Sequence, residues 1–320
     1  MSQALRYHPC LEQRAIADTF AESLQALLPF ERLHEAQCEP PALWERLDAI
    51  GLFAIGLDED AGGAGLGAAE EALIAMELGR RLVSPSVIAT LGAGHAQAVP
   101  GAAAAIAGLR VGAAYRGAHG CVLVADPDAD AILLRDGGTA SVHPVPAGAR
   151  LLDDALWLAP LQGVDAPGEA IASFDRTAVV RLRLNDAAVL AGIAATALEL
   201  AVAYALERRQ FGRQIGSFQA VKHHCANMAI AARNARDQVG FASVAVEQQR
   251  PDAAFQVDCA LLVAANAALR NAALNIQVHG GIGFSEEALP HVLLKRARLL
   301  VAITGGCEAA LERIASREAA

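Results

Sequence analysis

The chain has 320 residues and a formal net charge of −9 at pH 7, and its 54% of hydrophobic residues are mostly aliphatic, because aromatic residues make up only 4%. This length allows two or three structural units around a large core. The acidic charge argues against a nucleic-acid-binding surface, since such surfaces are basic. The cysteines form no C-x-x-C pair, which argues against a metal or disulfide framework and favours reduced thiols; they are Cys10, Cys38, Cys121, Cys225, Cys259 and Cys307.

The N-terminal segment is charged throughout, and no apolar run approaches the length of a membrane span. We therefore expect no signal peptide, no membrane span and a cytoplasmic location. Residues 1–110 are expected to be helical, because apolar residues recur at helical spacing over 21–28 and 43–50. A glycine-rich segment at 58–67 then precedes strong helix formers at 68–82.

Between residues 111 and 184 the pattern changes to short runs rich in β-branched residues, separated by Gly, Pro and Asp. The clearest runs are RVGAAY, CVLVAD, AILLRD, SVHPV and TAVVRLRL. They predict a small antiparallel sheet of five or six strands, with the last strand over 177–184.

Residues 185–320 are predicted to be helical. Over 187–203 the only polar side chains are Thr196 and Glu199, which predicts a central and mostly buried helix. Two further long helices are expected from Ser217 to about 249 and from 253 to about 278, and a shorter one follows. Short connections between long helices indicate an antiparallel bundle.

Two segments of this predicted bundle contain residues that could bind a ligand. In the first, Arg208, Arg209 and Arg213 gather around Phe211 at a helix–loop–helix corner, followed by Ser217 as the expected N-cap. Such arginines commonly complement a helix C-terminus, but guanidinium groups beside an aromatic ring also fit a phosphate and a flat group.

The second segment, QVHGGIGF at 277–284, places three glycines within four positions. One interpretation is a helix C-cap followed by a tight turn. The other is a site where a ligand comes close to main-chain N–H groups. The residues of this segment alone leave both interpretations open.

ERRQFGRQIGSFQAVKHHCANM (207–228) and NIQVHGGIGFSEEALPHVLLKRAR (275–298) resemble the two signature segments of the acyl-CoA dehydrogenase family, and residues 44–80 are similar to its N-terminal helical domain. The resemblance implies a mainly α fold with a small β domain. Its parts would be an N-terminal helical domain (1–110), a truncated antiparallel β domain (111–184) and a C-terminal four-helix bundle (185–320).

In that family the two signature segments bind the ADP half of an FAD that is held mainly by the neighbouring subunit. The resemblance implies that Arg208 pairs with the pyrophosphate and that Phe211 packs beside the cofactor. It assigns seven residues to this FAD corner: Arg208, Gln210, Phe211, Phe218, Gln277, Gly280 and Gly281. No metal is expected.

The family's reaction removes the α-proton of an acyl-CoA thioester with a glutamate while a hydride passes to the flavin. The usual glutamate position holds Thr304, which cannot act as a base near neutral pH. An alternative position near the start of the bundle holds Asn185, with Asp186 beside it; Asp186 and Glu308 are the remaining carboxylate candidates. The two β-domain segments that normally hold the flavin ring have no counterpart.

Three hypotheses follow. In the first, the chain is a shortened subunit in a heteromeric complex, as a two-plus-two tetramer with a full-length homologue, acting on a bulky CoA thioester of the kind found in steroid side-chain degradation. In the second, it is a self-sufficient homo-oligomer with Asp186 or Glu308 as the base. In the third, it is a non-enzymatic assembly paralogue. An electron-transfer flavoprotein is a further possible partner.

Overall fold

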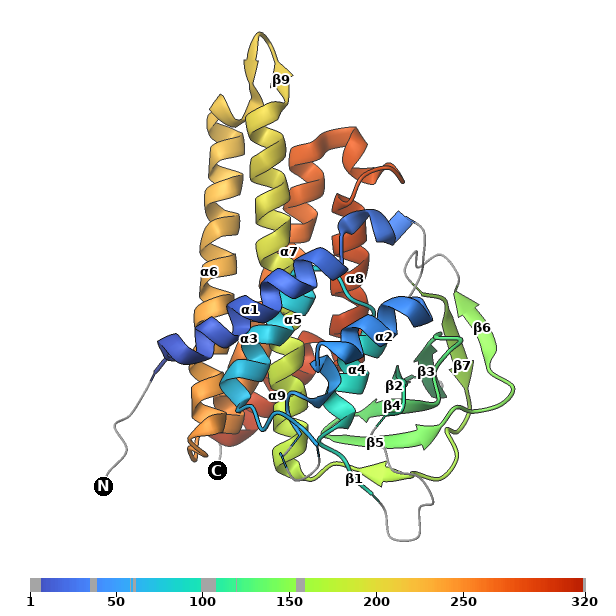
Figure 1. Ribbon diagram of the computed structural model, residues 1–320. Coiled ribbons are helices and arrows are strands. Elements are labelled where there is room, and N and C mark those ends of the chain that lie inside the picture. The colour runs from blue at the N-terminus through green and yellow to red at the C-terminus, as the bar shows by residue number, and fades with distance from the viewer. Residues whose placement is uncertain are drawn as a thin grey trace.

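The computed structural model describes residues 7–34, 39–57, 59, 62–98, 108–118, 120–153 and 159–318. Cys38 and part of the glycine-rich segment 58–67 lie outside these residues, and the other five cysteines are free thiols. Helices at the N-terminus and a small sheet lie beside a bundle of long helices (Figure 1). The mainly α fold with a helical domain, a β domain and a helical bundle is thereby confirmed.

The N-terminal part consists of α1 (Leu11–Leu27), η1 (Phe30–His34), α2 (Pro41–Ala49), η2 (Leu52–Ala54), α3 (Ala68–Arg80) and α4 (Pro85–Ala93). Both α2 and α4 begin with proline, whose fixed φ suits the first helical turn and whose missing N–H is not needed there. All nine residues of α4 are buried, and this helix packs against the sheet. These helices therefore connect the sheet to the bundle.

The sheet has eight strands in the order β1-β8-β5-β4-β2-β3-β7-β6. The strands are β1 (Gln97–Ala98), β2 (Val111–Gly117), β3 (Gly120–Val124), β4 (Ala131–Asp136), β5 (Thr139–Pro144), β6 (Arg150–Asp153), β7 (Leu161–Val164) and β8 (Ala172–Ser173). The expectation of a purely antiparallel sheet is wrong, because β2 and β4 pair in parallel. The hairpin β2–β3 places β3 on one edge of β2, and β4 then pairs with the other edge in the same direction as β2.

The expected strand over 177–184 is also wrong, because these residues belong to helix α5 (Arg176–Glu207). The side chain of Asp175 caps this helix by accepting a hydrogen bond of 2.8 Å from the Ala178 N–H. The alternation of Arg and Leu over 181–184 has the period of two that is typical of a half-exposed strand. In the helix, however, Arg181 and Arg183 both reach buried carboxylates, so that charged and apolar side chains alike face protein. The expected boundary between residues 184 and 185 falls inside this single helix.

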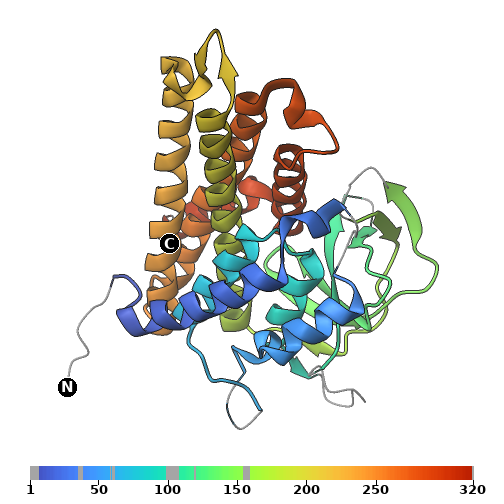
Figure 2. The same ribbon diagram turned by 45° about the horizontal axis from the view of Figure 1, so that its top comes forward.

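The bundle continues with α6 (Gln219–Glu247), α7 (Ala253–His279), α8 (Pro290–Ile303) and α9 (Gly306–Glu318). The long helices α5, α6 and α7 lie side by side in both views (Figures 1 and 2). From the sequence, Ser217 is expected as the N-cap of α6. This expectation is wrong, because the N-cap is Phe218. Ser217 lies in the preceding turn η4 (Ile215–Ser217), and its hydroxyl donates to the Gln214 carbonyl.

Helices α3 and α5 cross at two glycines. A Cβ atom added to Gly192 would overlap the Met76 carbonyl oxygen, and one added to Gly79 would overlap the Val189 carbonyl oxygen. The absence of side chains at both positions lets the two backbones touch. This contact fixes the N-terminal helices against the bundle.

Two segments are long and apolar enough to cross a membrane, contrary to our expectation. They are α5 and Ala253–Phe284, whose most apolar 18-residue windows have mean hydropathies of 1.9 and 1.3. In each window 56% of the residues are buried inside the fold. Core helices of soluble bundles have the same composition, so this property is explained by their central place between other helices.

Candidate functional site

The first predicted segment forms a short hairpin at the end of α5, made by β9 (Arg209–Gln210) and β10 (Arg213–Gln214). Figure 1 shows this hairpin projecting beyond the end of the bundle. Phe211 stands at its tip with φ of +53° and is 92% exposed. A left-handed backbone conformation is unfavourable for a bulky residue, and exposure of an aromatic ring to water is also unfavourable. Such unfavourable features are typical of functional positions.

The hairpin is organised by Phe218. The Arg213 guanidinium lies 4.2 Å from the centroid of the Phe218 ring, and the Phe211 ring meets it edge-on at 6.1 Å. Arg208 and Gln210 have exposed side chains, with no hydrogen bond or ion pair to any residue that the structure describes. Two polar side chains of the hairpin are thus available to a ligand.

The second predicted segment is the turn η5 (Gly280–Phe284), which follows α7. Gly280 is the C-cap of α7 with φ of +66°, and its N–H points back to the Gln277 and Ile276 carbonyl oxygens. The structure therefore confirms the C-cap interpretation for this glycine. A Cβ atom added to Gly280 or Gly281 would meet no atom within 4 Å, so both positions also face open space.

Tyr204 and His279 bring the two segments together. Their rings stack at a centroid distance of 4.1 Å, and they lie near the C-terminal ends of α5 and α7. Arg208 and Phe211 thus occur at the same end of the bundle as Gln277, Gly280 and Gly281. The seven residues assigned from the sequence gather at one corner.

The second location of interest is the position of the family's usual base. Thr304 ends α8, and its hydroxyl donates to the Val301 carbonyl at 2.8 Å. Asp186 on α5 accepts a hydrogen bond of 3.2 Å from Arg135 on β4. Thr304, Asp186 and Arg135 line one cavity of about 40 Å³, together with Tyr115 and Arg183. Glu308 is exposed on α9 and does not line this cavity.

Burial raises the pKa of the Asp186 carboxyl, while the charges of Arg135 and Arg183 oppose the shift. A carboxyl with a raised pKa is a common feature of a general base. The volume argues the other way, because pockets that bind small molecules measure roughly 300–1,000 Å³. A cavity of about 40 Å³ has room for a few water molecules and none for an acyl chain.

Residues 11–104 match the model of the acyl-CoA dehydrogenase N-terminal domain, and residues 174–319 match that of the acyl-CoA dehydrogenase C-terminal domain. The chain belongs to the acyl-CoA dehydrogenase family. The second match begins just before α5, in agreement with the helical state of residues 177–184.

Among relatives of this acyl-CoA dehydrogenase family member, the acyl-CoA dehydrogenase IpdE2 of Mycobacterium tuberculosis is 33% identical over 276 residues, which cover 80% of each chain. The acyl-CoA dehydrogenase FadE34 of the same organism is 33% identical over 296 residues. These cover 84% of this chain and 41% of FadE34, so the chain spans about two fifths of that relative. The solved ChsE4–ChsE5 complex from Mycobacterium tuberculosis has a similar fold, with a TM-score of 0.76 at 22% identity and coverage of 98% and 99% of the two chains.

Family membership implies FAD as the cofactor, and the corner has the groups that its ADP half requires. The Arg208 guanidinium suits a phosphate, and the exposed Phe211 ring suits a flat group. The open backbone at Gly281 leaves room for close approach. The residues at the corner therefore fit this half of the cofactor.

Sequence reasoning missed Arg135 and Arg183, which set the electrostatics around Asp186. Arg135 and Asp186 are 51 positions apart, on a strand and a helix, so no local pattern connects them. It also missed the buried Glu71 on α3, which accepts hydrogen bonds from Arg181 Nε at 2.6 Å and Asn185 Nδ2 at 2.5 Å and pairs with His95 Nε2 at 2.9 Å. The sequence gives little signal for Glu71, because it follows the acidic Glu70 in the first turn of a helix, where acidic residues are common.

Proposed function

We propose that this chain is the FAD-anchoring subunit of a heteromeric acyl-CoA dehydrogenase. A full-length homologous subunit would supply the base, the cradle of the flavin ring and the acyl-CoA pocket. The observation that carries the proposal is a contrast within one molecule. The Arg208 side chain is exposed and has no hydrogen bond or ion pair with the described residues, while the cavity beside Thr304 is nearly filled. The reaction of the complex is the α,β-dehydrogenation of an acyl-CoA thioester.

In this proposal the chain binds and orients the cofactor. FAD, when bound, supplies the acceptor for the two electrons of the dehydrogenation. Arg208 neutralises a pyrophosphate charge, and Phe211 packs against the cofactor with Gln210 and Phe218 nearby. The Gln277 side chain in the last turn of α7 and the Gly281 N–H donate hydrogen bonds to the cofactor. Gly280, whose own N–H caps α7, leaves room for its close approach.

The cavity beside Thr304 supports the assignment of the base to another subunit. A general base must lie within hydrogen-bonding distance of the proton that it removes. Asp186 is buried and paired with Arg135, and the space beside it is too small for a thioester. The Thr304 hydroxyl donates a hydrogen bond to the Val301 carbonyl oxygen in the last turn of α8.

One observation favours a second candidate, a self-sufficient homo-oligomeric flavoenzyme. Asp186 has a raised pKa and lies in the same cavity as Thr304, the residue at the family's base position. For Asp186 to act, the cavity would have to open and the ion pair with Arg135 would have to break. Glu308 lacks this support, because it lies outside the cavity.

The partner and the substrate class follow from similarity. The ChsE4–ChsE5 structure is a complex of two differently named proteins, which supports a hetero-oligomer in general. We propose a two-plus-two tetramer acting on a bulky CoA thioester, with an electron-transfer flavoprotein as the candidate electron acceptor.

The visible absorption spectrum tests the proposal. The chain is purified alone and after co-expression with full-length homologues from its own genome, and each spectrum is recorded before and after addition of an acyl-CoA. We expect a colourless lone chain and a yellow complex that bleaches. A lone chain that is yellow and bleaches would favour the homo-oligomer. An absence of colour in every preparation would overturn both and leave a non-enzymatic assembly protein.

A further inference from the structure

A groove of about 560 Å³ opens between α1, α3, α5 and α6. It shares no residue with the FAD corner or with the cavity beside Thr304. Its volume lies within the range of small-molecule sites, which is roughly 300–1,000 Å³. The groove therefore has room for a ligand of its own.

The inner surface of the groove is apolar at its centre. Met76 and Leu73 from α3 and Leu198 from α5 line it, together with five alanines from α1, α5 and α6. The guanidinium group of Arg80 also lines the groove. It forms ion pairs with Glu77 at 3.1 Å and with Glu199 at 2.9 Å. Because Arg80 has two carboxylate partners, its charge is already neutralised.

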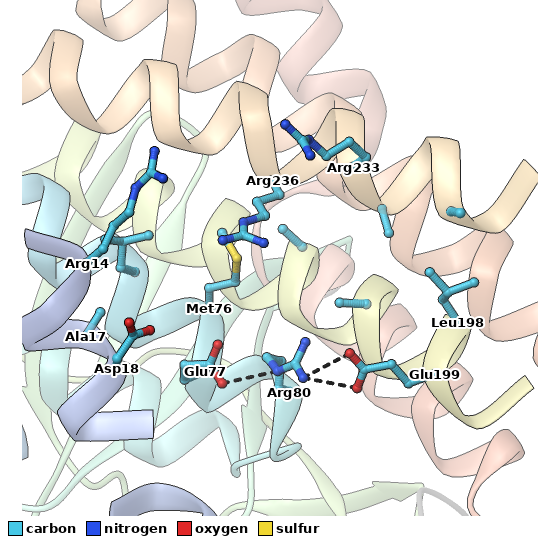
Figure 3. Close-up of a pocket in the computed structure, with 15 residues that line it drawn as sticks. Arg14, Ala17, Asp18, Met76, Glu77, Arg80, Leu198, Glu199, Arg233 and Arg236 are labelled. Atoms are coloured by element: carbon cyan, nitrogen blue, oxygen red, sulfur yellow. Dashed lines mark hydrogen bonds and ion pairs between the residues drawn. The ribbon is translucent and has the colours of Figure 1, made fainter. Parts of the chain in front are cut away.

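Three more guanidinium groups lie on the opposite side. Figure 3 shows them, Arg14, Arg233 and Arg236, on the other side of Met76 from the ion pairs that join Glu77, Arg80 and Glu199. Arg233 pairs with Asp237 at 2.6 Å. Neither the Arg14 nor the Arg236 side chain has a hydrogen bond or a salt bridge within 4.0 Å to any residue in the described part of the chain, although the charge of Arg236 acts on Glu77 from a greater distance. Two cations thus face the groove without a close partner.

The charges of the lining are unusual for this molecule. Four arginines line the groove against three carboxylates, Asp18, Glu77 and Glu199, whereas the whole chain carries a net charge of −9. Guanidinium groups select carboxylate and phosphate through paired N–H donors. An apolar surface beside such donors selects a ligand with an apolar body.

We propose that this groove binds a small amphipathic organic anion. The carboxylate or phosphate head of the anion lies between Arg14 and Arg236. Its apolar body covers Met76 and Leu198. The site is independent of flavin, so it stands whether or not the chain anchors FAD.

Isothermal titration calorimetry on the full chain tests this inference with four probes. Hexanoate and hexyl phosphate carry the two candidate head groups, hexanol carries the same apolar body without charge, and inorganic phosphate carries the head alone. We expect at least one of the two amphipathic anions to bind and the other two probes to bind more weakly. The anion that binds with the lower dissociation constant shows whether the site prefers a carboxylate or a phosphate head group.

Two variants connect the binding to the groove. Arg14→Gln and Arg236→Gln are each expected to raise the dissociation constant of the preferred anion about tenfold, which corresponds to the loss of one charge-assisted hydrogen bond. Arg150→Gln is the matched control, because Arg150 is an exposed arginine on β6 that does not line the groove. Circular dichroism verifies that each variant is folded.

The inference is overturned by any of three results. The first is that no amphipathic anion binds the wild-type chain at millimolar concentration. The second is that hexanol binds as tightly as the anions, which would mean a purely apolar groove. The third is that the two groove variants bind the anion as tightly as the Arg150→Gln control.

Discussion

Arg208 offers the most direct residue-scale test of the FAD corner. Its guanidinium is exposed at the end of α5, with no partner among the described residues. Replacing it with alanine removes a charge-assisted contact to phosphate, so Arg208→Ala is expected to weaken FAD retention in the assembled complex by roughly 1.5–3 kcal/mol. Flavin content after gel filtration and the FAD dissociation constant measure the effect.

Arg209→Ala is the control for this prediction. Arg209 is the next residue, it is also exposed, on β9, and it is not among the seven residues assigned to the FAD corner. Its replacement should leave flavin content close to that of the wild type. An Arg208→Ala complex that keeps its flavin as firmly as the Arg209→Ala complex would refute the assignment of Arg208.

At the residue scale, the sequence predicted what lies close together along the chain. The meeting of the two segments at one end of the bundle could be expected from the resemblance, because its residues lie in two short stretches of the chain, 208–211 and 277–281. The ion pair of Asp186 with Arg135 could not, because it depends on how the sheet packs against α5. Local patterns record local geometry, whereas a pKa depends on every charge and surface that folding brings near.

At the scale of elements, the crossing of α3 and α5 depends on Gly192. A Cβ atom there would overlap the Met76 carbonyl oxygen, and backbone atoms cannot move aside as a flexible side chain can. We expect Gly192→Ala to destabilise the chain by about 3 kcal/mol or more, measured as a lower midpoint of urea unfolding.

Gly281→Ala provides the comparison for this prediction. Its added Cβ would meet no atom within 4 Å, and the backbone at Gly281 is not left-handed. The unfolding midpoint should therefore remain close to that of the wild type. Equal midpoints for the two variants would contradict the close crossing of α3 and α5.

The prediction of elements failed where charged side chains turn toward buried partners. Apolar spacing correctly located the bundle helices, since each has an apolar face of helical period. The segment 177–184 was misread because Arg181 and Arg183 are charged and yet reach the buried carboxylates of Glu71 and Asp258. A pattern that divides residues into apolar and polar treats such arginines as exposed.

At the scale of the whole molecule, Glu71 joins three parts of the chain. It lies on α3 and contacts Arg181 and Asn185 on α5 and His95 after α4. Burial alone would raise the pKa of Glu71, but the hydrogen bond and charge of His95, with Arg181 and Asn185, outweigh it and hold the pKa below the usual 4.5. A lowered pKa stabilises the fold at neutral pH, and this stability is lost as the pH falls through the folded-state pKa, below 4.5.

Glu71→Gln removes this charge and leaves Arg181 without its carboxylate partner. At pH 7 we expect a loss of about 3 kcal/mol in the free energy of unfolding, as for other broken buried pairs. The difference between wild type and variant should narrow as the pH is lowered below 4.5. Urea unfolding over a pH series measures it, with the exposed Glu45→Gln as control. A difference that does not change with pH would show that charge is not the cause.

Helix α5 also has a consequence for how the molecule loses its structure. Its 32 residues form a rod of about 48 Å that contacts the N-terminal helices through α3, the sheet through β5 and the bundle through α7. None of these parts can release α5 without exposing apolar surface on the others. We therefore expect the unfolding of any one part to destabilise the other two, and a chain cut within α5 would leave each fragment without part of its packing surface.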